Sequence, residues 1–104
     1  MTDLKTHGID IDLSEEIAQG NYANLAIISH STSEFVIDFA TILPGLSKAK
    51  VKSRVILTPE HAKRLLYSLQ ENITRYESNI GKIEIPKPHT TEDPIINMGP
   101  MGKA

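Results

Sequence analysis

The chain has 104 residues, of which 39% are apolar and 23% charged, and its formal net charge is -2. This length suits one small domain, and the charge excludes a strongly cationic protein that binds nucleic acid or anionic membranes through its overall field. The lack of cysteine excludes disulfides, thiolate metal sites and cysteine nucleophiles.

The first segment, residues 1–8, is mostly polar, so we expect a loose N terminus. It lacks the charged and then apolar pattern of a signal peptide, and no run in the chain is long and apolar enough to span a membrane. We therefore expect a soluble, cytoplasmic protein without a membrane partner. Residues 9–13 alternate between apolar and acidic side chains, which predicts a short strand, and Ser14 begins at most one helical turn.

Three further strands are expected before residue 58. Residues 22–29 and 34–42 are rich in apolar side chains and lie on either side of a short polar break, which favours an antiparallel hairpin. Pro44-Gly45 predicts a β-turn, and residues 49–57 alternate clearly as the next strand.

A centred turn sets the expected pairing of the last two strands. It places Phe39 opposite Val51 and Asp38 opposite Lys52, so that apolar partners share one face. Leu25 is expected on the same face as Phe39.

A long helix is expected to follow directly. Thr58 suits the N-cap and Pro59 the first helical position, and Gly81 suits the residue after the C-cap. The apolar positions repeat with the spacing of a heptad seam. They are Ala62, Leu66, Leu69, Ile73, Tyr76 and Ile80.

The predicted fold is therefore α+β: an antiparallel meander of three to four strands, followed by one long C-terminal helix packed on one sheet face. The single domain spans residues 9–82, and the proline-rich residues 83–104 form an extended or disordered tail. The predicted core consists of Leu25, Ile27, Phe35, Ile37, Phe39, Val51, Val55, Leu65, Leu66, Leu69 and Ile73.

Both sheet faces carry apolar residues, whereas the chain supplies one long helix to cover them. A second subunit would cover the rest, so we predict a homo-oligomer, with a dimer as the first choice. The predicted interface consists of Ile28, Val36, Ile56, Leu66, Leu69, Ile73 and Tyr76.

Catalytic patterns are weak. The histidines lack metal-ligand spacing, and the chain has no glycine-rich phosphate loop and no nucleophile elbow. His30 with Glu34 or Asp38 could form an acid–base pair, but the same residues also suit a polar hairpin turn and a surface ion pair, which we favour. We therefore expect a protein that is not an enzyme and has no cofactor.

A basic row follows the Pro-Gly turn. It consists of Lys48, Lys50, Lys52 and Arg54, of which the last three share one face of a regular strand. Such rows can follow phosphates, but no aromatic residues suited to base stacking are interleaved. We favour a solvated face that is partly paired with Asp38.

Several short blocks occur in an order that resembles a known family. They are Tyr22-Ala23-Asn24-Leu25, Ser29-His30-Ser31, Glu34-Phe35-Val36-Ile37-Asp38-Phe39, Lys50-Val51-Lys52-Ser53-Arg54-Val55 and Thr58-Pro59-Glu60-His61-Ala62-Lys63. From about Gly20 to Gly81 the chain resembles a small prokaryotic family known only as a domain of unknown function, number 3467. The family implies no activity, substrate or cofactor. The order of elements is also similar to the start of the export chaperone SecB, which implies an oligomeric binding protein with a groove for peptides, although fold order alone does not give function.

Together these features predict a small oligomeric protein that acts as a non-catalytic protein-interaction or adaptor module, similar to a chaperone. Its expected partners are a second copy of the chain and another protein. The alternative is a nucleic-acid-binding protein that uses the Lys48–Arg54 strand.

Overall fold

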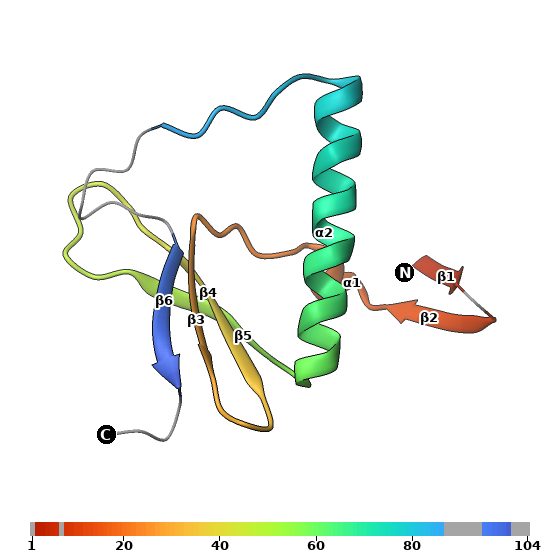
Figure 1. The fold of residues 1–104 in the computed structure, drawn as a ribbon, viewed down its shortest axis with the longest axis horizontal. Helices are drawn as coiled ribbons and strands as arrows, with labels where there is room; N and C mark the ends of the chain where they lie inside the picture. Colours follow the sequence, from red (N-terminus) through yellow and green to blue (C-terminus); the bar gives the residue numbers. More distant parts are fainter. Residues whose placement is uncertain (1, 7, 87–94, 101–104) are drawn as a thin grey trace.

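The computed structural model describes residues 2–6, 8–86 and 95–100 (Figure 1). Its elements are β1 (Thr2–Thr6), β2 (Ile9–Leu13), α1 (Glu15–Ala18), β3 (Leu25–His30), β4 (Phe35–Thr41), β5 (Lys50–Leu57), α2 (Pro59–Asn79) and β6 (Ile95–Pro100). The fold is α+β, as predicted. One sheet has four strands in the order β5-β4-β3-β6, and a second sheet consists of β1 and β2.

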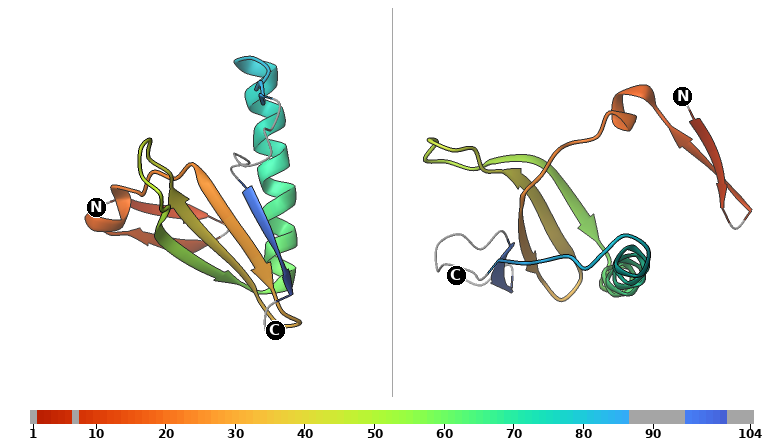
Figure 2. Two further views of the ribbon diagram at one scale, coloured as in Figure 1. Left: turned by 90° about the vertical axis from the view of Figure 1, so that its left-hand side faces the viewer. Right: turned by 90° about the horizontal axis from the view of Figure 1, so that it is seen from above.

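The N terminus differs from the expected loose segment. Thr2–Thr6 forms β1 and pairs antiparallel with β2. The alternating residues of β2 need a partner strand, and Gly8 allows a tight turn because its φ of 78° suits glycine. The hairpin lies to one side of the four-stranded sheet and is joined to it through α1 (Figure 2). Ser14 caps α1 by accepting a hydrogen bond from the Ile17 N–H at 3.2 Å, and the helix has a single turn, as expected.

The antiparallel meander of β3, β4 and β5 confirms the predicted central fold. The turn between β3 and β4 is closed by the Ser31 N–H, which donates to the Glu34 carbonyl at 2.9 Å. In the turn after β4, the Leu46 N–H donates to the Leu43 carbonyl at 3.2 Å, and Gly45 has a φ of 82°. This geometry is that of a type II turn with glycine at its third position.

The expected register between β4 and β5 is wrong. Phe39 pairs with Ser53 and Asp38 pairs with Arg54, whereas Val51 pairs with Ala40. The register shifts after Phe39, which leaves Lys52 without an opposite residue in β4. Lys52 is therefore the extra residue of a β-bulge, an insertion that alternation alone does not reveal.

The pairing separates the sheet into two faces, because residues directly opposite each other point to the same side. The Val36 face consists of Leu25, Ile27, Ser29, Val36, Asp38, Ala40, Arg54 and Ile56. The Phe35 face consists of Ala26, Ile28, His30, Phe35, Ile37, Phe39, Ser53, Val55 and Leu57.

The core lies on the Val36 face. Among the residues whose burial the structure describes, the buried hydrophobic ones are Leu25, Val36 and Ala40. The expected placement of Leu25 beside Phe39 is wrong, because Leu25 pairs with Ala40. On the Phe35 face, Phe35, Ile37 and Phe39 are only half-buried.

Helix α2 begins and ends as predicted. Thr58 accepts a hydrogen bond from the His61 N–H at 3.2 Å, and the N–H of the C-cap residue Ile80 donates to the Tyr76 carbonyl at 2.8 Å. The helix starts at the end of β5, on one side of the sheet, and its later turns extend away from the strands (Figures 1 and 2). None of its residues is buried. The expected burial of Leu65, Leu66, Leu69 and Ile73 within a single chain is therefore wrong.

The tail adds one element that the sequence does not predict. Ile95–Pro100 forms β6, which pairs in parallel with β3 at the edge of the sheet. An edge position suits Pro100, because proline has no backbone N–H to donate and an edge strand needs no donor on its open side. The rest of the expected extended or disordered tail, from 87 to 94 and from 101 to 104, lies outside the described residues.

Candidate functional site

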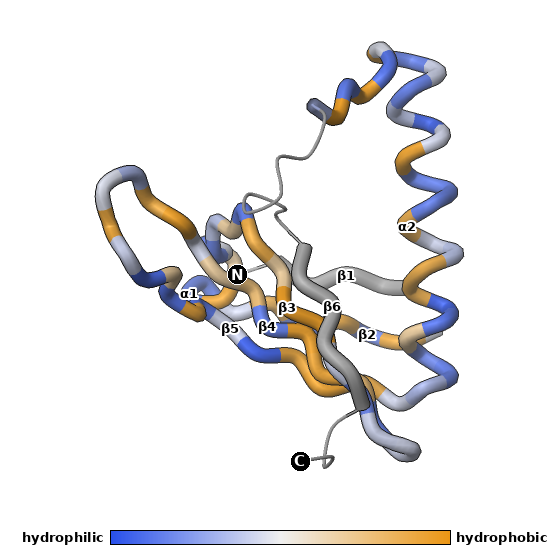
Figure 3. Tube along the Cα trace, turned by 60° about the vertical axis from the view of Figure 1, so that its left-hand side comes forward, coloured by the Kyte–Doolittle hydropathy of each residue, from blue (hydrophilic) through white to orange (hydrophobic). Residues whose placement is uncertain are grey.

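An open apolar groove separates α2 from the Phe35 face of the sheet. Its volume is about 650 Å³. Figure 3 shows hydrophobic positions of α2 along the side of the helix that faces the sheet. The residues that line the groove are Ile28, Phe35, Ile37, Pro59, Ala62, Lys63, Leu65, Leu66 and Leu69.

The chemistry of this groove is that of a binding surface for apolar side chains. Lys63 is the charged residue in its lining, and the other lining residues are hydrophobic or proline. Beyond Leu69, the exposed Ile73 and Tyr76 continue the apolar stripe along α2. A ligand that fills the groove and also follows the stripe would need to be as long as the helix itself.

The structure brings together part of the predicted oligomer interface. Leu66 and Leu69 line the groove, and so does Ile28 from the sheet. Val36 and Ile56 pair with each other on the opposite face, where Val36 is only 3% exposed and Ile56 is exposed. Ile28 therefore does not share a face with Val36 and Ile56, because it pairs with Ile37 on the Phe35 face.

Arg54 is held by an ion pair on the Val36 face. Its Nε donates to Asp38 Oδ1 at 2.7 Å, and its Nη2 donates to Oδ2 at 2.8 Å. These hydrogen bonds from Arg54 lower the pKa of Asp38 below its ordinary value of 3.8, against the opposing effect of desolvation. Arg54 is thus separated from the lysines of the predicted basic row, which contradicts the expected shared face.

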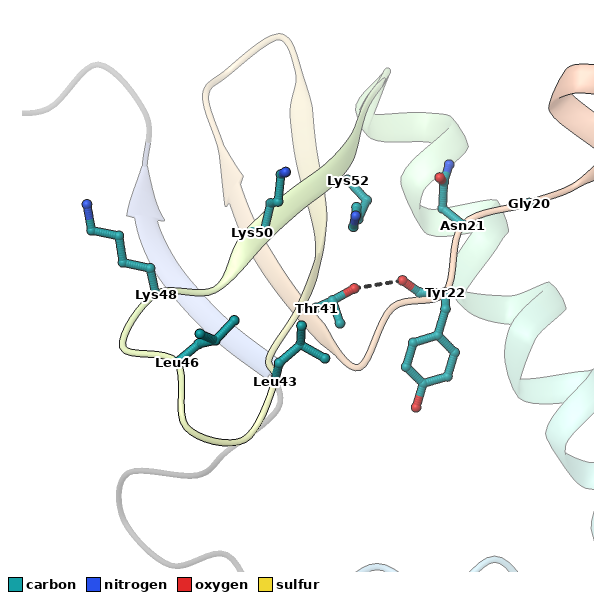
Figure 4. Close-up of a pocket in the computed structure, with 9 residues that line it drawn as sticks. All are labelled: Gly20, Asn21, Tyr22, Thr41, Leu43, Leu46, Lys48, Lys50 and Lys52. Carbon is teal, nitrogen blue, oxygen red and sulfur yellow. Dashed lines mark hydrogen bonds between the residues drawn. The ribbon is translucent and has the colours of Figure 1, made fainter.

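The other three basic residues surround a second hollow, which we name the lysine pocket. It has a volume of about 410 Å³. Figure 4 shows that the three lysine side chains spread apart around it and do not converge on one point. Thr41 Oγ1 donates to the Tyr22 carbonyl at 2.9 Å and joins two sides of the pocket. The lining residues are Gly20, Asn21, Tyr22, Thr41, Leu43, Leu46, Lys48, Lys50 and Lys52.

His30 and Asp38, one of the two acid–base pairs considered from the sequence, lie on opposite faces of the sheet. The His30 ring stacks on the Phe35 ring, with 5.2 Å between their centroids. His30 therefore lies on the Phe35 face, whereas Asp38 lies on the Val36 face and binds Arg54. The Ser31 hydroxyl accepts hydrogen bonds from the Ser33 and Glu34 N–H groups, as expected of a turn residue. Within the described part of the chain, no group of three or more His, Asp or Glu residues could hold a metal ion.

Sequence reasoning missed two features of these surfaces. Phe35 and Ile37 line the groove, although the alternation of their strand placed them in a covered core. Leu43 and Leu46 flank the lysine pocket, because the turn carries them toward the start of β5. The signal in the sequence was a leucine on each side of Pro44-Gly45.

A protein-family model described as "Protein of unknown function (DUF3467)" matches residues 1–85. The match covers most of the chain, so the chain belongs to this family. It begins earlier than the resemblance from Gly20 onward and includes the β1–β2 hairpin. No curated protein and no solved structure matches the chain, and the similarity to SecB is not confirmed. In the described residues, no helix has the length and apolar character needed to cross a membrane.

Proposed function

We propose that this member of the DUF3467 family is a non-catalytic protein-interaction module that functions as a homodimer, in an adaptor or chaperone-like role. The open apolar groove, together with the uncovered stripe of α2, carries the proposal. Leu65, Leu66 and Leu69 all remain exposed in the single chain. Contiguous exposed apolar surface of this kind marks an interaction site in a soluble domain.

The dimensions of the chain support the same conclusion. Its radius of gyration is 16.4 Å, whereas a compact domain of 100 residues has a radius of about 13 Å. Since α2 extends away from the sheet and the β1–β2 hairpin lies to one side of it, much of the surface that a compact domain would bury stays open (Figure 1). A second copy can restore this burial, and apolar area removed from water contributes about 25 cal/mol per Å².

The lysine pocket offers a second surface, for a partner other than the same chain. Exposed Tyr22, Leu43 and Leu46 lie beside the three lysines. This combination suits an acidic protein segment that also carries apolar side chains. Nucleic acid is the alternative partner, and it is favoured by the three lysines that line this one pocket. The spread of the lysine side chains and the pairing of Arg54 with Asp38 count against it.

Sedimentation equilibrium with two matched variants tests the dimer. Leu66 and its neighbour Tyr67 are 52% and 57% exposed, but only Leu66 lines the groove. We expect the wild type to be a dimer, Leu66→Ser to shift it toward monomer, and Tyr67→Ser to leave it unchanged. A wild type that remains monomeric at high concentration would contradict the proposal, and so would equal effects of the two substitutions.

A further inference from the structure

We propose that the groove receives helix α2 of a second copy, antiparallel to the first, with Lys63 opposite Glu77 of the partner copy. This inference rests on the proposed homodimer and specifies how the two chains meet. The groove ends at Leu69, but the apolar stripe continues through Ile73 and Tyr76. The occupant therefore has to be a long apolar element, and α2 itself is a helix of 21 residues with such a stripe.

The spacing of the stripe fixes the pairing of two antiparallel helices. The seam of a heptad repeat consists of alternating a and d positions, which here are Leu66, Ile73 and Ile80 (a) and Ala62, Leu69 and Tyr76 (d). In an antiparallel pair of helices, each a residue faces a d residue of the partner. If all six seam residues are used, Leu69 lies opposite the partner's Ile73, Leu66 opposite the partner's Tyr76, and Ala62 opposite the partner's Ile80. Every seam residue then faces an apolar or aromatic side chain of the partner along the whole stripe.

This pairing also aligns opposite charges. Lys63, Gln70 and Glu77 each follow directly after a seam residue and lie one heptad apart on the same edge of α2. In the antiparallel arrangement Lys63 meets the partner's Glu77, and the two-fold axis repeats the pair at the other end. Gln70 meets the partner's Gln70 at the axis. The Glu77 carboxylate also accepts a hydrogen bond from the Ile83 N–H at 3.1 Å, which holds it at the end of the helix.

A parallel pair of helices lacks this match. The edge that carries Lys63 and Glu77 would then face the opposite edge of the partner, which carries Leu65, Asn72 and Asn79. Neither charge would meet a charge of opposite sign. Charge complementarity therefore selects the antiparallel arrangement over the parallel one.

The arrangement also fills both grooves. The first half of α2 forms one wall of its own groove, and the second half extends away from the sheet. In an antiparallel pair, the second half of each helix lies beside the first half of the other. Ile73 and Tyr76 of one copy would thus enter the groove beside Phe35 and Ile37 of the other, and by symmetry both grooves would be closed.

A charge swap tests the register. Lys63→Glu and Glu77→Lys each place like charges opposite each other at both ends of the pair, and we expect each to weaken the dimer about tenfold. The double variant restores opposite charges and should dimerise like the wild type. If the single changes leave dimerisation unaffected, or if the double variant does not restore it, this register is overturned but the dimer is not. A monomeric wild type would overturn both.

Cross-linking gives an independent readout, since the chain has no native cysteine. Gln70→Cys places two thiols near each other at the two-fold axis, and a short bis-maleimide should link the copies efficiently. Lys63→Cys lies at the equivalent position one heptad earlier, where the two thiols of an antiparallel pair lie far apart, so it should not be linked. Equal linking of both variants would show a parallel pair and contradict the proposal, and so would failure of Gln70→Cys in a dimeric sample.

Discussion

Replacing Leu69 with alanine tests whether a second copy covers helix α2. Leu69 is 54% exposed in the single chain. Full burial of a leucine side chain contributes about 1.5–3 kcal/mol to the free energy of unfolding. Since about half of the Leu69 side chain is covered in the single chain, Leu69→Ala should cost an isolated chain about 1 kcal/mol. If a partner helix covers the exposed half, the cost should rise to the range for a buried leucine, about 2–5 kcal/mol for each copy.

Urea unfolding followed by circular dichroism separates these two values. Two chains that unfold together should gain stability with concentration, by about 2.7 kcal/mol per dimer for a hundredfold increase. Leu69→Ala should lose most of this dependence. Val36→Ala serves as the control, because Val36 is only 3% exposed within one chain. Its cost of about 2 kcal/mol should be the same at both concentrations. A cost of about 1 kcal/mol for Leu69→Ala at every concentration would refute the reasoning.

Three further outcomes follow from the described contacts. Because Arg54 lowers the pKa of Asp38 in the folded chain, the stabilisation from this pair is present above the ordinary pKa of 3.8 and is lost as the pH falls through the lower folded value. Asp38→Asn should therefore reduce the loss of unfolding free energy at acid pH. An unchanged loss in this variant would contradict the pairing. Thr58→Ala should cost about 1 kcal/mol by removing the N-cap of α2, whereas Thr74→Ala in the middle of the helix should not lower the urea midpoint. We expect no retention on heparin at physiological salt; strong, salt-sensitive retention that is abolished by Lys50→Glu with Lys52→Glu would favour nucleic acid as the partner.

Local chemistry was sufficient to predict the helices and turns. The ends of α2 are set at Thr58, Pro59 and Gly81 by interactions between residues that are close in the sequence. The turn at Pro44-Gly45 likewise depends only on the backbone conformation of these residues and their neighbours. Strand β6 was different, since its pairing with β3 joins segments far apart in the chain and in a parallel direction. The sequence of Ile95–Pro100 carries no local pattern that specifies such a partner.

The groove was harder to predict than the helix that forms it. The heptad spacing of Leu66, Leu69 and Ile73 correctly indicated an apolar stripe, but a stripe does not tell which surface covers it. In the single chain the sheet covers too little of this stripe to bury any residue of α2. The expected core was therefore assigned to one chain, in which Leu65, Leu66 and Leu69 in fact remain exposed.

The β-bulge at Lys52 accounts for the misplaced basic row. In a regular strand Lys50, Lys52 and Arg54 would share one face. The inserted residue changes the alternation, so that Lys50 and Lys52 line the lysine pocket while Arg54 lies opposite Asp38 on the other face. The same insertion thus places Arg54 on the Val36 face, where it pairs with Asp38, and leaves Lys50 and Lys52 on β5, a strand at the edge of the sheet. Lysines at an edge strand oppose pairing with further strands, which favours assembly of two copies through α2 and its groove over assembly through the edge of the sheet.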